Sequence, residues 1–417
     1  VVTADESARG GGAVQGWPQL FVAAVPATLW ILAPVIAHQV SRINDPVELA
    51  ADDDEVAALR LVARRTWEFF VAFVTAADRH LPPDNYQESP VPLVAHRTSP
   101  TNIGLYLLTV VSARDFGWIG LSEAVDRLEA TTSSVLDLEH EAGHLYNWYD
   151  TQTGQPLVPR YISSVDSGNL VGHLLTLAAA CSQWQEDPTR AGCRPSGILD
   201  GLALVRATIP GEVTLNIGTE LGRRLGRVDQ AIRQLPDRPG EADLDTLTVS
   251  VKHLSDTPGL DSATQSAVGA LASTIASQQR DLSMTTSEVA ELVNRIALLE
   301  SQARDAVDTT DFALLLDPSR KLLSVGYRVD ERERDESCYD LLASECRLAS
   351  FIGIAKGDLP TRHWSRLGRA VTAAGNQAVL LSWSGSMFEY LMPPLVMRRA
   401  PQGLLASTCR RVVRRQR

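Results

Sequence analysis

The feature of the chain that most constrains its fold is the regular change from helix-periodic segments to polar loops. Apolar residues recur at three- and four-residue intervals in most segments, and stretches with Pro, Gly and Asn separate these segments. No strand pattern alternates with the helices, so the order favours an array of helical hairpins over a parallel sheet with crossover helices. The helices predicted for this array are residues 52–75, 103–114, 122–139, 170–185 and 339–354, with a last helix at the C-terminal end.

The middle of the chain differs in character from the rest. From residue 201 to about residue 308 the helices are polar and amphipathic, and no aromatic residue occurs between Trp184 and Phe312. Residues 260–306 predict two long helices that are broken near Ser283. This region is therefore expected to be an inserted helical segment and not the site of chemistry.

A small β-hairpin is the one expected exception to the helical pattern. Residues 312–316 and 322–327 flank the turn Asp317-Pro-Ser-Arg, which is typical of a hairpin connection. The expected division of the chain is an apolar N-terminal segment at 1–45, the first part of a module at 46–200, the insertion at 201–308, and the continuation of the module at 309–417.

An uncharged run near the N-terminus raises the question of a membrane. Leu20–Ala37 has the length of a short transmembrane helix, but it contains Pro26 and Pro34. Hydropathy alone leaves two interpretations open, a membrane span and a buried or interfacial helix. No basic segment precedes the run, which disfavours a signal peptide.

Charge and cysteine content exclude other classes. The net charge is −11, so a broad nucleic-acid-binding face is not expected. Five cysteines without a CxxC spacing argue against a zinc knuckle or a disulfide framework and favour a reducing compartment. His140 and His144 have the spacing of a zinc-binding helix, but Gly143 interrupts that helix, and no cofactor fingerprint is present. Neither a metal nor a cofactor is expected.

Two loops carry side chains suited to a sugar. The Pro-rich stretch 81–102 offers donors and acceptors to a polyol, although a stiff connector with helix caps would explain the same composition. The stretch 144–151 places aromatic rings beside an amide and a carboxylate, which match the apolar faces and hydroxyl edges of sugars; a core-facing aromatic turn is the alternative. The candidate binding residues of these loops are Asp84, Asn85, His96, Arg97, Asn147, Trp148, Tyr149 and Asp150.

Two further segments complete the set. Small polar residues precede an apolar helix, so Asp166 or Ser167 could cap it; the alternative is that Asp166 and Asn169 face a substrate. Glu389 stands among Trp383, Met, Phe and Tyr, and a carboxylate in such company is either paired or a catalyst with a shifted pKa. Glu389 is the predicted catalytic residue, and Trp383 is a predicted sugar contact.

Long runs of the sequence resemble the cyclic β-1,2-glucan synthases, which are very large bacterial inner-membrane proteins. The resemblance covers most of residues 46–417, apart from the region 201–308. The runs that carry it are "LPPDNYQESPVPLVAHRTSPTNIGLYLL", "ARDFGWIG", "GHLYNWYDTQTGQPLVPRYISSVDSGNLVGHLL", "DPSRKLLSVGYRVDE", "YDLLASECRLASFIGIAKGDLP" and "SWSGSMFEYLMPPLVM".

The resemblance implies a fold and an activity. It places the chain at the start of the central glycoamylase-like module, which is similar to (α/α)6-barrel β-1,2-glucanases, so an all-α partial barrel is expected. The implied activity is ring closure of linear β-1,2-glucan by retaining transglycosylation, with Glu389 as the nucleophile and Tyr146, Trp148 and Tyr149 as sugar platforms. The acid/base glutamate of the family would lie beyond residue 417.

The resemblance also implies a setting and leaves alternatives. Linear β-1,2-glucan and the remainder of the synthase are the expected partners, at the cytoplasmic side of the inner membrane. The chain is expected to be an inactive fragment of the synthase. A β-1,2-glucan hydrolase and a non-catalytic glucan-binding scaffold are the alternatives.

Overall fold

A computed structural model describes most of the chain. The described residues are 24, 26–35, 51–188, 194–209, 219–374, 377–398 and 403–416, with the backbone only at 377. Residues 24 and 26–35 are helical and exposed, whereas the rest of the predicted run Leu20–Ala37 lies outside the described part. Among the helices that are described, none combines the length and the apolarity that crossing a membrane requires.

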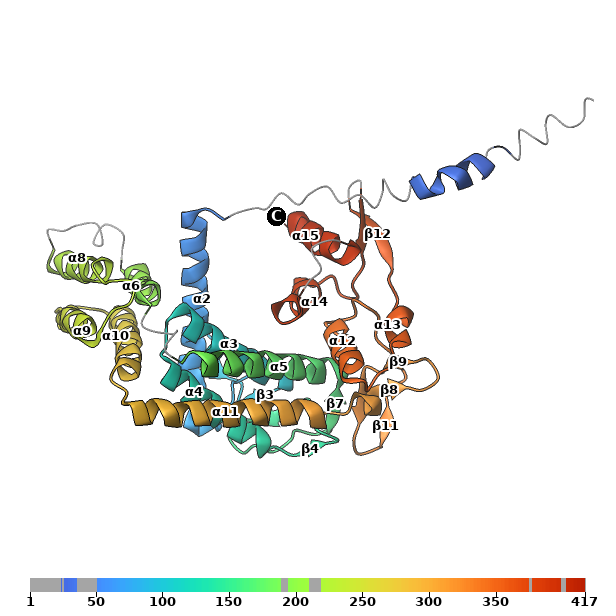
Figure 1. Cartoon of the computed structure of the whole chain (residues 1–417), viewed down its shortest axis with the longest axis horizontal. Coiled ribbons are helices and arrows are strands. Elements are labelled where there is room, and N and C mark those ends of the chain that lie inside the picture. The colour runs from blue at the N-terminus through green and yellow to red at the C-terminus, as the bar shows by residue number, and fades with distance from the viewer. Residues whose placement is uncertain are drawn as a thin grey trace, which may run out of the picture.

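The main body is a layer of long helices around α5 (Ser164–Glu186). The helices α3 (Pro100–Phe116), α11 (Thr286–Thr309) and α12 (Arg347–Lys356) pack against α5, and α2 (Asp53–Phe73) and α4 (Leu121–Leu136) lie beside α3 (Figure 1). Local sequence sets the ends of α3. Ser99 caps its first turn with Pro100 at the first position, and Gly117 ends it with a φ of +79°. Large aromatic side chains in the core of this body include Trp67, Trp118, Trp184, Tyr106, Tyr146, Tyr149 and Phe312.

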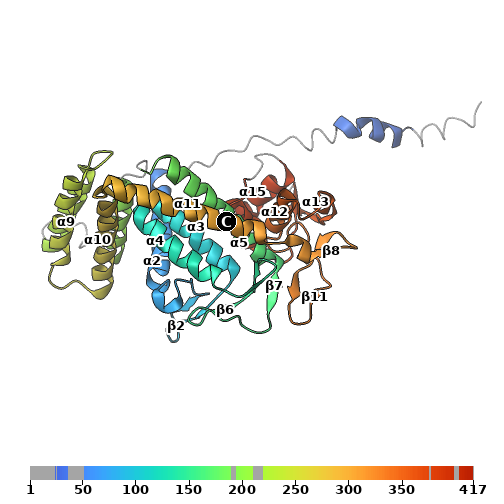
Figure 2. The same cartoon turned by 60° about the horizontal axis from the view of Figure 1, so that its bottom comes forward.

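A second group of helices has its own core. It consists of α6 (Pro195–Thr208), α8 (Glu220–Arg233), α9 (Glu241–Ser255) and α10 (Ser262–Leu282), which pack around apolar residues separate from those of the main body. Both views place α9 and α10 at the end of the molecule opposite α13 (Arg362–Arg366) (Figures 1 and 2). The predicted break near Ser283 is confirmed. Since α11 packs along α5, we propose that the inserted region ends between α10 and α11.

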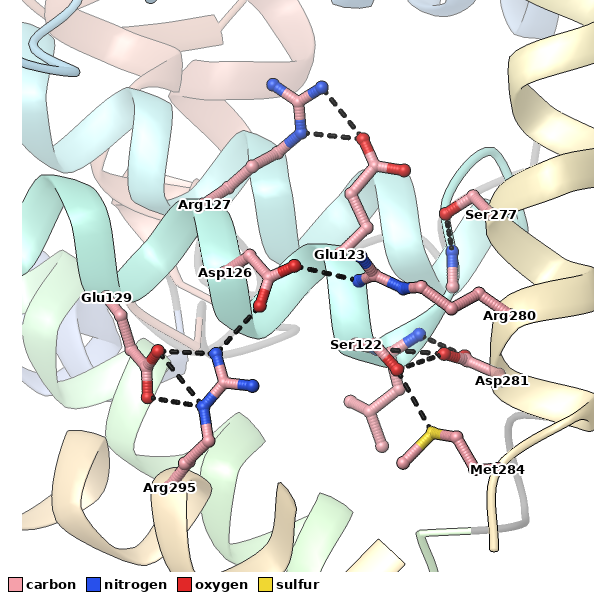
Figure 3. Close-up of polar contacts among 12 residues, drawn as sticks. Ser122, Glu123, Asp126, Arg127, Glu129, Ser277, Arg280, Asp281, Met284 and Arg295 are labelled. Carbon is pink, nitrogen blue, oxygen red and sulfur yellow. Dashed lines mark hydrogen bonds and ion pairs between the residues drawn. The ribbon is translucent and has the colours of Figure 1, made fainter. Parts of the chain in front are cut away.

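The start of α4 is held by side chains of α10. Its N-cap is Gly120, which has no side chain to satisfy the free N–H groups of the first turn. Ser277 accepts a hydrogen bond from the N–H of Gly120 at 2.9 Å, and the carboxylate of Asp281 accepts from the N–H groups of Leu121 and Ser122 (Figure 3). The two cores are therefore joined by a polar cap as well as by apolar packing.

We expect Asp281→Ala to loosen this junction. The substitution leaves two helix N–H groups unpaired and removes a negative charge from the positive end of α4, so local stability should fall by about 2 kcal/mol. Hydrogen exchange at the first turn of α4 measures this loss. Asp305→Ala is the matched control, because Asp305 is exposed on α11 and its side chain makes no hydrogen bond or ion pair within the described residues. Equal exchange in both variants would contradict the capping role.

The C-terminal part consists of short elements. Besides α13, its helices are α14 (Met387–Leu391) and α15 (Leu404–Gln416).

The remaining short elements are spread along the described chain. Short stretches of 3-10 helix occur at Ala76–Asp78, Phe312–Leu315 and Pro393–Leu395. The strands are β1 (Tyr86–Gln87), β2 (Leu93–Val94), β3 (Arg97–Thr98), β4 (His140–Glu141), β5 (His144–Leu145), β6 (Tyr149–Asp150), β7 (Tyr161–Ser163), β8 (Leu316–Asp317), β9 (Leu322–Leu323), β10 (Gly326–Arg328), β11 (Glu333–Arg334), β12 (Val371–Ala374) and β13 (Gln377–Leu380).

The predicted hairpin is confirmed as β8 and β9, which pair Leu316 with Leu323. Its predicted arms are too long, because residues 312–315 form a 3-10 helix and residues 326–327 belong to β10, which pairs with β7. The expectation that the hairpin is the one exception to the helical pattern is wrong, since other short strands pair as well. The prediction of a helix from residue 339 is wrong, because α12 begins only at Arg347. The N–H of Tyr339 donates to the carbonyl of Leu323 at 3.0 Å, which ties this segment to the hairpin and not to a helix. The predicted all-α class is confirmed, since the fold is mostly helical; the described residues contain no closed barrel.

Candidate active site

Glu389, in α14, is only 5% exposed, and hydrogen-bond donors of the protein surround its carboxylate. The N–H of Ser344 donates to Oε1 at 3.1 Å, and the N–H of Ser386 donates to Oε2 at 3.2 Å. Ser384 donates to Oε2 with its hydroxyl at 2.8 Å. Burial alone would raise the pKa of Glu389, but hydrogen bonds from Ser382, Ser384 and Ser344 outweigh it and lower the pKa. Glu389 is therefore ionised near neutral pH, as an attacking carboxylate must be.

Part of this arrangement is ordinary helix capping. Ser386 is the N-cap of α14, and Glu389, three positions later, completes a capping box with it. Capping does not account for Ser344, which comes from the loop before α12 and is 45 positions away along the chain. A second segment of the fold therefore converges on the same carboxylate.

The backbone of Glu389 is held as firmly as its carboxylate. In a helix the carbonyls of Glu389 and Tyr390 would accept from residues 393 and 394, but these are Pro393 and Pro394, which have no N–H. Arg347 supplies the missing donors, with Nη1 at 2.7 Å from the carbonyl oxygen of Glu389 and Nη2 at 2.6 Å from that of Tyr390. Arg347 is 1% exposed, so this bidentate contact lies inside the protein.

A second buried glutamate, Glu345, is linked to the carboxylate of Glu389 through Ser344. The hydroxyl of Ser344 donates to Oε2 of Glu345, while the N–H of the same serine donates to Glu389. Burial raises the pKa of Glu345, and the hydrogen bonds from Ser344 and Asn169 offset only part of that effect. One serine thus joins two glutamates whose pKa values shift in opposite directions.

From Glu345 a line of hydrogen bonds runs to the second predicted sugar loop. Nδ2 of Asn169 donates to Oε1 of Glu345 at 3.2 Å and to the hydroxyl of Thr101 at 3.0 Å. Thr101 donates to Oδ1 of Asp166 at 2.5 Å. In the amide orientation that satisfies both of its neighbours, Asn147 donates to Oδ2 of Asp166 at 3.0 Å. Burial raises the pKa of Asp166, as it does that of Glu345.

The line ends at a partly exposed aromatic ring. In the same orientation, the side-chain amide oxygen of Asn147 accepts from Nε1 of Trp148 at 3.2 Å. The guanidinium of Arg97 lies 4.6 Å from the centre of the Trp148 ring. Arg97 also pairs with Asp84 at 2.9 Å, and the exposed Asn85 donates to Asp84. We call the connected set the polar line; its members are Trp148, Asn147, Asp166, Thr101, Asn169, Glu345, Ser344 and Glu389.

Other predicted residues have different surroundings. Tyr149 is 0% and Tyr146 2% exposed, so the prediction that they are sugar platforms is wrong. Their rings are stacked 6.0 Å apart in the core, and the hydroxyl of Tyr149 donates to the carbonyl of Glu139, so the core-facing alternative holds. His96 pairs with Asp78 at 2.7 Å, and within the described residues it has no hydrogen bond to a member of the polar line.

Two further candidates lie apart from the line. Asp150 accepts from the N–H groups of Gln152 and Thr153, which lowers its pKa and gives it a role in the turn. Trp383 is 57% exposed and lies six positions before Glu389 in the chain. The centre of its ring is 5.8 Å from that of Tyr339. Trp383 therefore offers a free ring face close in the chain to the carboxylate.

Sequence reasoning missed Thr101, Ser344, Glu345 and Arg347. Glu345 and Arg347 are embedded in the otherwise apolar run "LLASECRLAS", whose periodicity resembles a helix. One signal was available for Arg347. Pro393 and Pro394 follow Glu389 and Tyr390 by four residues and have no N–H. The sequence therefore indicates that the carbonyls of Glu389 and Tyr390 need a donor from elsewhere.

Known proteins resemble the chain in sequence and in fold. Cyclic β-(1,2)-glucan synthase NdvB of Rhizobium meliloti is 42% identical to the chain in an alignment 412 residues long, which covers 94% of this chain and 14% of that protein. No protein-family profile matches the chain. A solved structure described as a glucoamylase, from Bacteroides caccae, aligns with a TM-score of 0.50 at 10% identity and covers 87% of this chain and 66% of that one. An endo-β-1,2-glucanase from Chitinophaga pinensis aligns with a TM-score of 0.49 at 9% identity, with the same coverage.

These findings settle the resemblance and the fold. At 10% identity the Bacteroides caccae structure shows a shared fold alone, and that fold agrees with the predicted partial barrel of helical hairpins. The chain spans only 14% of the length of the synthase, so the activity of the whole synthase does not pass to it by comparison. Along nearly its whole length, this chain is a relative of one segment of the cyclic β-1,2-glucan synthases.

Proposed function

We propose that the chain is part of a module that closes linear β-1,2-glucan into a ring by retaining transglycosylation, with Glu389 as the nucleophile. The observation that carries the proposal is the ionised carboxylate of Glu389, held by donors from two segments and connected through the polar line to the partly exposed Trp148. The similarity to a cyclic β-(1,2)-glucan synthase supports the substrate. Association with the inner membrane, on its cytoplasmic side, is part of the same proposal.

The chemistry proceeds in two steps. An oxygen of Glu389 bonds to the anomeric carbon of a glucose unit while the glycosidic bond to the leaving chain breaks, and a proton passes to the departing oxygen. The 2-hydroxyl at the non-reducing end of the bound chain then attacks the same carbon and passes its proton to the group that protonated the leaving oxygen, which closes the ring and frees the carboxylate of Glu389. An acceptor hydroxyl replaces water only where the site holds the chain end and excludes solvent.

The proton for the leaving oxygen must come from a second carboxylate. We do not assign this role to Glu345: its raised pKa suits a proton donor, but its two oxygens face Asn169 and Ser344. Asp166 is committed to Thr101 and Asn147 in the same way. We therefore assign the polar line to orientation and substrate contact, with Trp148, Arg97 and Trp383 as the ring and edge partners of glucose units.

The substrate assignment is tested by titrating the protein with linear β-1,2-glucan in a calorimeter. Linear β-1,3-glucan of equal length is the matched control, since it offers the same sugar with a different chain path. Binding of the β-1,2-glucan alone is expected. Equal binding of both glucans, or of neither, overturns the assignment. Release of reducing ends without ring products would favour a hydrolase, and binding without any turnover would favour a scaffold.

A further inference from the structure

Ser344, the residue shared by the two glutamates, has an unusual backbone conformation. Its φ is +51°, in the left-handed region that side chains other than those of Gly, Asn and Asp rarely adopt. In this conformation its N–H faces Glu389 and its hydroxyl faces Glu345. Such a conformation persists only where surrounding contacts hold it. The side-chain contact that the structure gives for Ser344 is its hydrogen bond to Glu345.

Glu345 is itself fixed in place. Its other oxygen accepts from Nδ2 of Asn169 at 3.2 Å, and the residue is 4% exposed. Within the described residues it makes no hydrogen bond to Glu389, and Ser344 is the residue that bonds to both glutamates. Asn169 in turn belongs to α5, the central helix of the main body. Ser344 is thus linked through Glu345 and Asn169 to α5.

We propose that Glu345 is a positioning residue for Glu389. By accepting the hydroxyl of Ser344 it keeps that serine in the left-handed conformation, and so keeps the Ser344 N–H on the attacking carboxylate. The proposal rests on the proposed function, because only there is Glu389 a nucleophile, but its test needs no substrate.

Other charged or titratable groups surround α14 and are left unchanged by the test. Arg347 of α12 holds the carbonyls of Glu389 and Tyr390, and Cys409 of α15 donates from Sγ to the carbonyl of Tyr390 at 3.4 Å. Asp340, in the loop before α12, accepts from Nε1 of Trp383 at 3.5 Å. Because they are common to every variant, a difference between variants reports on Ser344 and Glu345.

The test is an NMR titration of the protein labelled with ¹³C at the glutamate carboxyl carbons, in which Glu389→Gln assigns the Glu389 signal. Two variants of one residue are compared. Ser344→Ala and Ser344→Gly both remove the hydroxyl, but only glycine adopts a positive φ without cost. Ser344→Ala is expected to raise the titration midpoint of Glu389 by about one pH unit, because the N–H leaves the carboxylate. Ser344→Gly is expected to leave the midpoint unchanged.

Glu345→Ala gives the complementary result. It should raise the midpoint as Ser344→Ala does, and adding Ser344→Gly to it should restore the original value. An unchanged midpoint in Ser344→Ala, or equal shifts in Ser344→Ala and Ser344→Gly, overturns the proposal even if Glu345→Ala fails to fold. Absence of β-1,2-glucan binding alongside the expected midpoints would overturn the proposed function and leave the positioning role intact.

Discussion

Glu389→Gln is expected to abolish glycosyl transfer from an activated donor. A suitable donor is the β-fluoride of a β-1,2-linked glucose disaccharide, because fluoride leaves without a proton and the reaction then depends on the nucleophile alone. Glutamine keeps the size of the side chain but removes the negative charge, so fluoride release should fall by a factor on the order of 10³ or more. A fluoride electrode measures the rate, and mass spectrometry identifies the glycosylated peptide.

The matched control for this variant is Glu288→Gln. Glu288 occupies the third position of α11 in a capping box with Thr285, as Glu389 does in α14 with Ser386, but it is exposed on the surface. If Glu389 were only a capping residue, the two variants would release fluoride equally fast. The wild-type rate should also persist below pH 4.5, the ordinary pKa of a glutamate, and fall only as Glu389 becomes protonated at its lowered pKa.

The helical part of the fold was predictable because it depends on local patterns. The break between α10 and α11 follows from periodicity and the polar residues near Ser283. The start of α3 was predicted three residues late, at 103, although Ser99 and Pro100 form a cap that the sequence already contains. Residues 339–346 show the limit of such patterns. Their apolar spacing predicts a helix, but the hydrogen bond of Tyr339 to the β-hairpin and the positive φ of Ser344 are tertiary features that periodicity does not contain.

The site was predictable in its parts and not in its connections. Asp166, Asn169 and Glu389 stand out as polar residues in unusual company, and the structure connects them. Tyr149 stood out for the same reason, yet its ring fills the core, because aromatic composition does not say which face of a loop is buried. Glu345 was hidden because a single carboxylate in an apolar run has no pattern until its partners are known.

Arg347→Met is expected to loosen the segment that carries Glu389. Methionine fills similar space without donors, so the carbonyl of Glu389 would be buried without a partner and that of Tyr390 would keep only the weak Sγ donor of Cys409. The N–H groups that a helix would supply are missing at Pro393 and Pro394. Removing the guanidinium also recovers part of its burial cost, which leaves a net loss of about 2.7 kcal/mol from two charge-assisted hydrogen bonds.

Hydrogen exchange in residues 380–395 measures this loss, since 2.7 kcal/mol corresponds to about 100-fold faster exchange at 25 °C. Arg362→Met is the matched control, because Arg362 is exposed on α13 and the described residues give it no hydrogen bond or ion pair. Glu389 should remain chemically intact in Arg347→Met, yet fluoride release should fall, because the carboxylate depends on a backbone that the arginine holds. Unchanged exchange in Arg347→Met would mean that the two carbonyls find other donors, and that α14 keeps its geometry without the buried arginine.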